Sequence, residues 1–474
     1  MHTRLFKLAA LAAALVLAGC ASINIDQTLA DTNASTAGLT QGKLTLARTP
    51  EQRQAREQLA ASLLGKPLAM DDAVQLALAN SPAVQTLIAQ SWADMAAANQ
   101  GGRIANPVFT FERMRLGNEL EIGRLLSFGL LDLLTLPRRQ GIAASQVAQA
   151  RVQLSVRVVG EVNQVRQAWV RAVAAQQSLT YAEQVNRSAQ ASAELARRMQ
   201  AVGNFNRLQR ARQQLFYADA TAQLAVASQG ALAAREELVR QLGLTDDQAA
   251  KLTLPERLPD LPPAPRDAAS LSSAAFEQRL DVQMARLQLD AAGKAQGLNL
   301  LTSLIDVDIG LRNDTVFNTT TGARDNRRGF ELDIRLPLFD WGDARRSAMN
   351  AQALAAANRY DSVTRSAGSQ LRESYGAYRT AYDLARHYRD EIVPLRQAMA
   401  EENVLRYNGM LIGVFELLAD SREQIASVMA AINAQQQFWL ADAGLSSSLL
   451  GKPMTIGATT APMTSSTGME GGGH

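Results

Sequence analysis

The chain has 474 residues, with 48 lysines and arginines against 45 acidic residues and a single cysteine. This near balance of charge leaves no basic footprint for nucleic acid, and one cysteine cannot form an internal disulfide or a multi-thiolate metal site. Hydrophobic residues make up 47% of the chain but aromatic residues only 5%, which is typical of long packed helices rather than of a large globular core.

The first 19 residues have a basic start followed by an apolar run from 8 to 18. The run is too short to span a bilayer, so the segment is interpreted as a secretory signal peptide. Its end, LAGC, resembles the lipobox of bacterial lipoproteins. The resemblance implies a covalent lipid on Cys20, and Ala21 after it favours the outer membrane. The alternative is an ordinary signal peptide with an incidental cysteine.

No apolar run of 18 residues remains after removal of the signal peptide, which excludes a bundle of transmembrane helices. If the mature chain crosses a membrane, it must cross as strands. Residues 20–66 are interpreted as a lipid-anchored N-terminal tether, flexible over 21–45.

Two halves of the chain, each of roughly 200 residues, follow the same order of elements. Helical spacing predicts a helix over 67–100 and another over 274–296. Between the halves, 252–267 contains five prolines and can be neither helix nor central strand. The predicted organisation is a first repeat over 67–251, a linker over 252–267, a second repeat over 268–451 and a flexible tail over 452–474.

Each predicted opening helix is followed by segments that alternate apolar and polar residues. The clearest are 304–312 and 330–337, and the polar segment 313–329 between them is expected to be a long exposed hairpin loop. The counterpart over 108–137 alternates less cleanly. For any one strand, a soluble sheet explains the pattern equally well. Two strands of ~10 residues per half are long enough to cross a bilayer, but four strands cannot close a barrel alone.

Very long helices are predicted after each pair of strands. A helix from 138 to 202 would be ~100 Å long and would need coiled-coil partners. The helical pattern breaks at 201–206 and again at 407–416, so each half is expected to end in an antiparallel helical hairpin. Pro394 is expected to kink the outgoing helix of the second hairpin.

The repeated order of helix, two strands, long helix, turn and long helix resembles the TolC-like outer-membrane efflux protein family. RLPLFDWGDARRSAMNAQA (335–353) at the strand-to-helix junction and VFELLADSREQ (414–424) after the second turn carry the resemblance, which covers 67–451. With the lipobox, it points to the lipoprotein subgroup of tripartite efflux systems. It implies a mainly α fold with a membrane β-barrel, in which three copies build one 12-stranded barrel and a periplasmic α-helical barrel.

The same resemblance implies a homotrimer in the outer membrane of a Gram-negative bacterium. The trimer would pass drugs or metal ions outward, together with a periplasmic adaptor protein and an inner-membrane transporter. It implies no enzyme activity, no nucleic-acid partner and no cofactor beyond the lipid on Cys20. The transported solute cannot be read from the sequence.

The two helical turns are the expected docking points, because family members receive the adaptor there. The resemblance implies six docking residues: Val202, Gly203, Asn204, Ile412, Gly413 and Val414. The alternative is that the two glycines only permit the turns.

Just past the second turn, Glu416 and Asp420 lie four residues apart on one helical face, so a trimer would bring six carboxylates to its axis. The family resemblance implies a periplasmic gate with an acidic ring that selects cations. Glu416 matches when FELL is aligned, whereas Asp420 is shifted by one position. The alternative is a solvated helical face paired with Arg422.

Other chemistry receives little support. The three histidines, His2, His387 and His474, are scattered and form no catalytic group. Methionines in the tail suit Cu(I), but its Gly, Ser and Thr content is more typical of disorder, so no metal site is predicted.

The sequence leaves two alternative functions: a lipid-anchored periplasmic adaptor and a structural coiled-coil protein without a pore. The duplication and the two hairpins argue against an adaptor, which has one hairpin. The alternating strands argue against a purely structural coiled coil.

Overall fold

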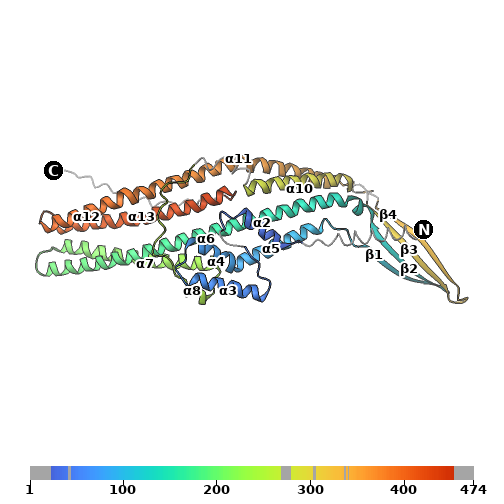
Figure 1. The fold of residues 1–474 in the computed structure, drawn as a ribbon, viewed down its shortest axis with the longest axis horizontal. Coiled ribbons are helices and arrows are strands. Elements are labelled where there is room, and N and C mark those ends of the chain that lie inside the picture. Colours follow the sequence, from blue (N-terminus) through green and yellow to red (C-terminus); the bar gives the residue numbers. More distant parts are fainter. Residues whose placement is uncertain are drawn as a thin grey trace.

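The structure is a computed structural model and describes residues 23–40, 44–267, 279–302, 306–335, 338–339 and 341–452. The predicted signal peptide, Cys20 and the tail beyond 452 lie outside these residues. Figure 1 shows an elongated molecule with two helical hairpins at one end and the strands at the other. No helix among the described residues combines the length and the apolar character needed to cross a membrane.

The four strands form one antiparallel sheet in chain order: β1 (Val108–Leu116), β2 (Glu119–Gly129), β3 (Asp306–Asn318) and β4 (Arg324–Arg335). The pairing of β2 with β3 joins the two repeats, with Leu126 opposite Leu311. The expected long loop over 313–329 is wrong, because β3 and β4 continue into this segment and only 319–323 separate them. Polar pairs such as Asn313 with Arg328 extend the ladder, since backbone hydrogen bonds do not require apolar side chains.

The first hairpin consists of α6 (Leu130–Ala201) and α7 (Arg207–Leu242). α6 begins at Leu130 rather than near residue 138, and Pro137 lies inside it. Pro137 is the eighth residue of α6, beyond the N–H groups that lack partners at a helix start, so it removes one interior hydrogen bond without ending the helix.

The second hairpin consists of α11 (Asp343–His387), η2 (Tyr388–Ile392), α12 (Val393–Asn408) and α13 (Val414–Leu449). η2 is a π-helical turn, and Pro394 follows it in the first turn of α12. The irregular turn lies where Pro394 was expected to disturb the helix, because the ring of proline displaces the carbonyl one turn before it.

The helix expected over 67–100 is two helices, α4 (Met70–Asn80) and α5 (Pro82–Gln100). Pro82 occupies the first turn of α5, the position that proline prefers in a helix. The counterpart of this segment in the second repeat is α10 (Leu280–Thr302).

Two further helices, α2 (Ile25–Ser35) and α3 (Pro50–Leu64), precede the first repeat. Their buried residues, including Ile25 and Leu64, belong to the same core as Trp169 of α6. The tether expected over 20–66 is therefore wrong for its described part, which is helical and packed.

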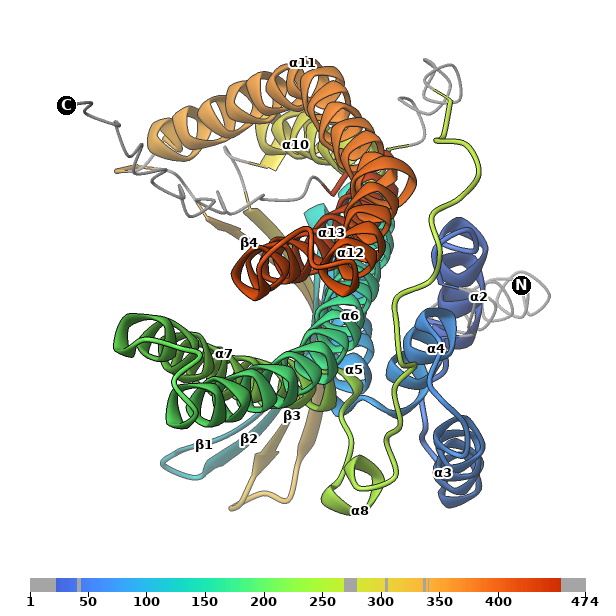
Figure 2. The ribbon, with the colours of Figure 1, turned by 90° about the vertical axis from the view of Figure 1, so that its left-hand side faces the viewer.

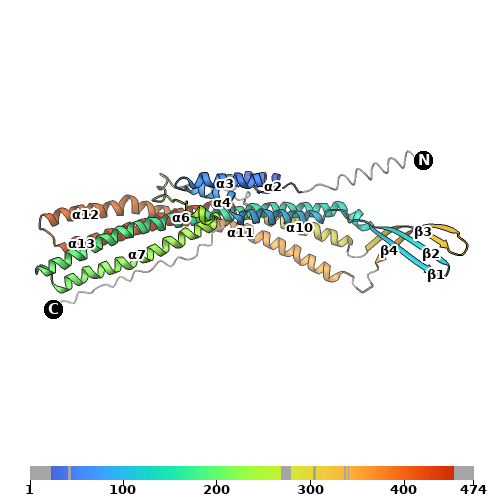
Figure 3. The same cartoon turned by 90° about the horizontal axis from the view of Figure 1, so that it is seen from below.

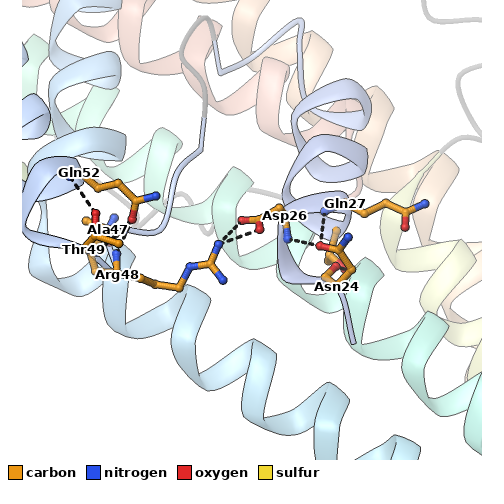
Figure 4. Close-up of polar contacts among 9 residues, drawn as sticks. Asn24, Asp26, Gln27, Ala47, Arg48, Thr49 and Gln52 are labelled. Carbon is orange, nitrogen blue, oxygen red and sulfur yellow. Dashed lines mark hydrogen bonds and ion pairs between the residues drawn. The ribbon is translucent and has the colours of Figure 1, made fainter. Parts of the chain in front are cut away.

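Local contacts explain why these helices form. The Asn24 side chain accepts hydrogen bonds from the backbone N–H groups of Asp26 and Gln27, and Thr49 forms a capping box with Gln52. Arg48 Nη2 lies 2.7 Å from both carboxylate oxygens of Asp26, which joins the segment before α3 to α2 (Figure 4). These caps were visible in the sequence and were missed.

The helices are arranged as an arc around one open side (Figure 2). α7, α6, α13, α12 and α11 follow this arc, and α2, α3, α4 and the short α8 (Asp246–Ala249) lie on its convex side. Figure 3 shows α10 and α11 diverging as they approach the strands.

The linker over 252–267 contains neither helix nor strand, yet it is fixed along the second hairpin. Tyr382 Oη donates to the carbonyl of Pro262 at 3.0 Å, and Trp439 Nε1 donates to that of Pro259 at 3.0 Å. The Tyr378 hydroxyl accepts from Arg266 N at 3.0 Å. The linker therefore joins the two repeats through specific hydrogen bonds.

Candidate functional site

The sheet has one face of exposed apolar side chains, which we call the apolar face. Strand register places these residues on it, all of them exposed except the half-buried Leu126: Phe109, Leu126, Phe128, Ile309, Leu311, Phe330, Leu332 and Ile334. Phe330 is 78% exposed and Leu311 61% exposed, so no part of the described chain covers them. A contiguous exposed surface of this kind requires an apolar environment.

The opposite face is polar and internally paired. Arg312 contacts the carboxylates of Asp314 at 2.7 Å, Glu112 at 3.2 Å and Glu331 at 3.4 Å. Gly123 leaves room for this group, since a Cβ there would lie 3.3 Å from Asp314 Oδ1. The sheet thus separates an apolar surface from an ion-paired one, as a wall between lipid and water would.

The first hairpin turn contains three of the predicted docking residues. Gly203 has a φ of +80°, and a Cβ at this position would meet nothing within 4 Å. The turn therefore needs glycine for its backbone conformation and not for space. Val202 is 71% exposed, and the backbone N–H of Asn204 donates to Met199 O at 2.9 Å.

This geometry makes a prediction for the first turn. Gly203→Ala should lower the free energy of unfolding by about 1 kcal/mol, because a Cβ is unfavourable in the left-handed region. Gly203→Asn should cost clearly less, since asparagine tolerates that region. Denaturant midpoints of both variants test this, and equal stability of the two would contradict a conformational role for Gly203.

The second turn is built differently. Gly413 has an ordinary φ of −80° and open space around it, and the residue in the left-handed region is Met410, with a φ of 58°. The interpretation that Gly413 merely permits the turn is therefore wrong. Met410 is 93% exposed and Leu411 73% exposed, whereas Ile412 is half-buried.

The exposed apolar pair, Met410 and Leu411, was missed in the sequence. The signal was present, since three large apolar residues stand between glycines in the segment GMLIG, and the first two of them are the exposed pair. Together with Val202, they give the hairpin end of the molecule exposed apolar side chains on both turns. Such residues favour contact with a partner.

The two predicted acidic residues have different surroundings. Glu416 lies exposed in the first turn of α13, and within the described part of the chain it forms no ion pair. Asp420 is half-buried and accepts a hydrogen bond from Asn403 Nδ2 of α12. Asn403 is itself 8% exposed and was missed, because the sequence does not show which face of α12 meets α13.

The alternative in which these acids pair with Arg422 is wrong. The Arg422 guanidinium lies 4.3 Å from the ring centroid of Phe216 on α7, and Arg422 Nη2 donates to Arg212 O at 3.5 Å. Arg422 thus joins the two hairpins through a cation–π contact and leaves Glu416 free of a cationic partner.

One carboxylate on α6 is fixed by its neighbours. Two arginines, Arg197 and Arg198, donate to Glu194 at 2.8–2.9 Å and lower the pKa of Glu194 to about 2. The helix near the first turn therefore carries a carboxylate that is already charged at any physiological pH.

Among the described residues, no group of three or more His, Cys, Asp or Glu side chains is arranged to hold a metal ion. His387 pairs with Glu391, at 3.2 Å, within one turn of helix. The tail methionines and His474 lie outside the described residues.

Comparisons with known proteins agree with this geometry. Residues 271–437 match the model of the family described as outer membrane efflux protein. No curated protein sequence matches the chain.

Solved structures of low identity share the fold. A membrane protein from Pseudomonas aeruginosa is 19% identical, with a TM-score of 0.65 over 80% of this chain and 93% of that one. The outer membrane protein VceC from Vibrio cholerae is 15% identical, with a TM-score of 0.66 over 81% and 96%. The Campylobacter jejuni CmeC outer membrane channel is 12% identical, with a TM-score of 0.68 over 87% and 90%. The duplicated fold expected from the sequence is confirmed.

Proposed function

We propose that this chain, a member of the outer membrane efflux protein family, forms the exit duct of a tripartite efflux system. The observation that carries the proposal is the continuity of the molecule. A sheet with an apolar and an ion-paired face leads directly into an arc of long helices (Figures 1 and 2). Such a shape provides a wall for a channel rather than a site for chemistry.

The protomer is incomplete as a channel. β1 and β4 are the edge strands of the four-stranded sheet, and an open edge inside a membrane leaves backbone groups without partners. Three copies supply 12 strands, which close the sheet around the ion-paired face. The concave sides of the three helical arcs then enclose a periplasmic tunnel.

The two ends of the molecule are assigned to different partners: the sheet to the membrane and the helical turns to the adaptor. The lipid on Cys20 and the apolar face hold the trimer in the outer membrane of a Gram-negative bacterium. At the other end, we assign Val202, Gly203, Asn204, Ile412, Gly413 and Val414, together with Met410 and Leu411, to docking of the periplasmic adaptor. The adaptor links the duct to an inner-membrane transporter, which selects drugs or metal ions.

We assign the acidic ring of the periplasmic gate to Glu416 first and to Asp420 second. Glu416 is exposed and without a cationic partner in the described chain, whereas Asp420 is held by Asn403. Three copies of Glu416 near the axis attract cations and repel anions over a distance of about one Debye length, ~8 Å at physiological salt.

Single-channel recording in planar bilayers tests the proposal. Glu416→Gln should reduce the ratio of cation to anion permeability by about threefold at low salt, and the effect should fade at high salt because of screening. Asp420→Asn should change the ratio less, since its amide oxygen still accepts from Asn403. Glu423→Gln is the control, because Glu423 pairs with Arg396 at 2.6 Å.

Two results would contradict the proposal. If a conducting trimer of Glu416→Gln has unchanged ion selectivity, the assignment of the acidic ring to Glu416 is wrong. A folded, trimeric protein that never conducts, even with altered turns, would favour the adaptor or the structural coiled coil.

A further inference from the structure

Toward the β1–β2 and β3–β4 turns, basic side chains appear on the apolar face. Five arginines continue it there: Arg113 and Arg115 on β1, Arg124 on β2, and Arg324 and Arg328 on β4. Register places Arg124 opposite Phe111 and Arg324 opposite Phe317, and both phenylalanines lie on the same face as Leu311. We call these five residues the arginine patch.

The acidic residues of the same strand ends lie on the other face. Strand alternation and pairing place Glu112, Glu119, Glu121, Asp314 and Asp325 there, beside Arg312. The described strands therefore carry no carboxylate on the side of the arginine patch. This separation distinguishes the patch from an ordinary mixed surface, on which charges of both signs alternate.

The arginine patch and Arg312 also differ in their ion pairs. Arg312 has three carboxylate partners, whereas none of the five arginines has an ion pair within the described residues. Arg124 Nη1 donates to Thr315 Oγ1 at 3.4 Å, and Arg324 lies 5.4 Å from the centroid of Phe317. Their charges remain available to an anion.

The rise per residue of a strand gives the distance of the arginine patch from Phe330 of the apolar face. Arg328 lies two residues beyond Phe330 and Arg324 lies six beyond it, which is about 7 to 20 Å along a strand. This is the end of the sheet away from the helices (Figure 1). In a trimer with a periplasmic helical tunnel, that end of the lipid-facing surface meets the headgroups of the outer leaflet.

We propose that the arginine patch binds phosphate groups of lipid headgroups in the outer leaflet, as lipid A presents them. This inference rests on the proposed function, because it needs the apolar face in lipid. The guanidinium fork matches phosphate in two parallel hydrogen bonds, and the long side chain can reach up from an apolar surface. Closure of the barrel places β4 of one copy beside β1 of the next, which gathers four of the five arginines at each boundary between copies.

The test compares binding of bisphosphorylated lipid A with binding of the same lipid after removal of its phosphates. The full-length trimer in detergent is titrated with each, and bound lipid is counted by native mass spectrometry. The variant Arg113→Gln/Arg115→Gln/Arg324→Gln/Arg328→Gln should bind the phosphorylated lipid at least tenfold more weakly. Inorganic phosphate at millimolar concentration should compete poorly, because it lacks the acyl chains that hold the lipid against the apolar face.

The control variant is Arg327→Gln/Arg345→Gln/Arg359→Gln/Arg365→Gln. It removes the same charge, but Arg327 lies on the opposite face of β4 and the others lie on α11. Equal binding of the two lipids by the wild type, or equal loss in both variants, would overturn the proposal. If the wild type conducts in bilayers without phosphate-selective binding, the inference fails and the proposed function stands. If the wild type neither inserts nor conducts, both fail.

Discussion

Gly243→Ala should lower the free energy of unfolding by about 3 kcal/mol. Gly243 ends α7 with a φ of +64°, which costs an alanine about 1–2 kcal/mol. Its new Cβ would lie 2.5 Å from Pro82 Cδ and 2.7 Å from Ser81 Cα, and backbone atoms cannot move aside as a flexible side chain can. The remaining loss comes from this overlap.

The matched control is Gly230→Ala on the same helix. A Cβ at Gly230 meets nothing within 4 Å, and alanine is favoured over glycine in a helix by about 1 kcal/mol. Gly230→Ala should therefore leave stability unchanged or raise it, so in detergent the denaturant midpoint of Gly243→Ala should fall and that of Gly230→Ala should not. Similar midpoints would show that α7 and the α4–α5 junction do not pack as described.

The second repeat contains a glycine with a positive φ in the equivalent position. Gly451 follows α13 with a φ of +89°, and a Cβ there would lie 2.9 Å from the backbone nitrogen of Asp281 on α10. α7 and α13 are thus each followed by a glycine with a positive φ. Gly243 packs against the start of α5 in the first repeat, and Gly451 packs against the start of α10 in the second. The duplication therefore extends to packing details that sequence comparison of the two halves had not indicated.

The strongest periodicities predicted the architecture. A 3.6-residue period over long proline-free segments and a two-residue period over 304–312 and 330–337 leave few alternatives, so the hairpins and strand pairs were predictable. The expected helix start near 138 and the loop over 313–329 were wrong, because neither Pro137, the eighth residue of α6, nor the polar residues at the strand ends interrupt the backbone pattern.

The N-terminal helices and the site details were predicted less well. α2 is rich in Thr and Ala, so its low apolar periodicity resembled a tether although its caps were present. The spacing of Glu416 and Asp420 indicated a shared face, but only tertiary packing shows that Asn403 holds Asp420. Contacts between helices far apart in the sequence, such as Arg422 with Phe216, leave no pattern in a single chain.

Arg279→Leu should lower the free energy of unfolding by about 3 kcal/mol, because it removes one partner of a buried charge pair. The Arg279 side chain is 1% exposed, and its guanidinium binds both carboxylate oxygens of Asp281 at 3.0 and 2.8 Å. It also donates to Ala367 O at 3.1 Å and to Gln370 Oε1 at 3.2 Å, so it ties the start of α10 to α11. Loss of the guanidinium leaves these acceptors unsatisfied.

Arg365→Leu on α11 is the control, since its partner Asp361 is 63% exposed and Arg365 itself is 83% exposed. An exposed pair of this kind contributes little, so this variant should stay within about 0.5 kcal/mol of the wild type. Thermal unfolding followed by circular dichroism measures both. Because Arg279 ties the start of α10 to α11, Arg279→Leu should also increase proteolysis within α10. Resistance equal to that of Arg365→Leu would show that Arg279 does not hold these two helices together.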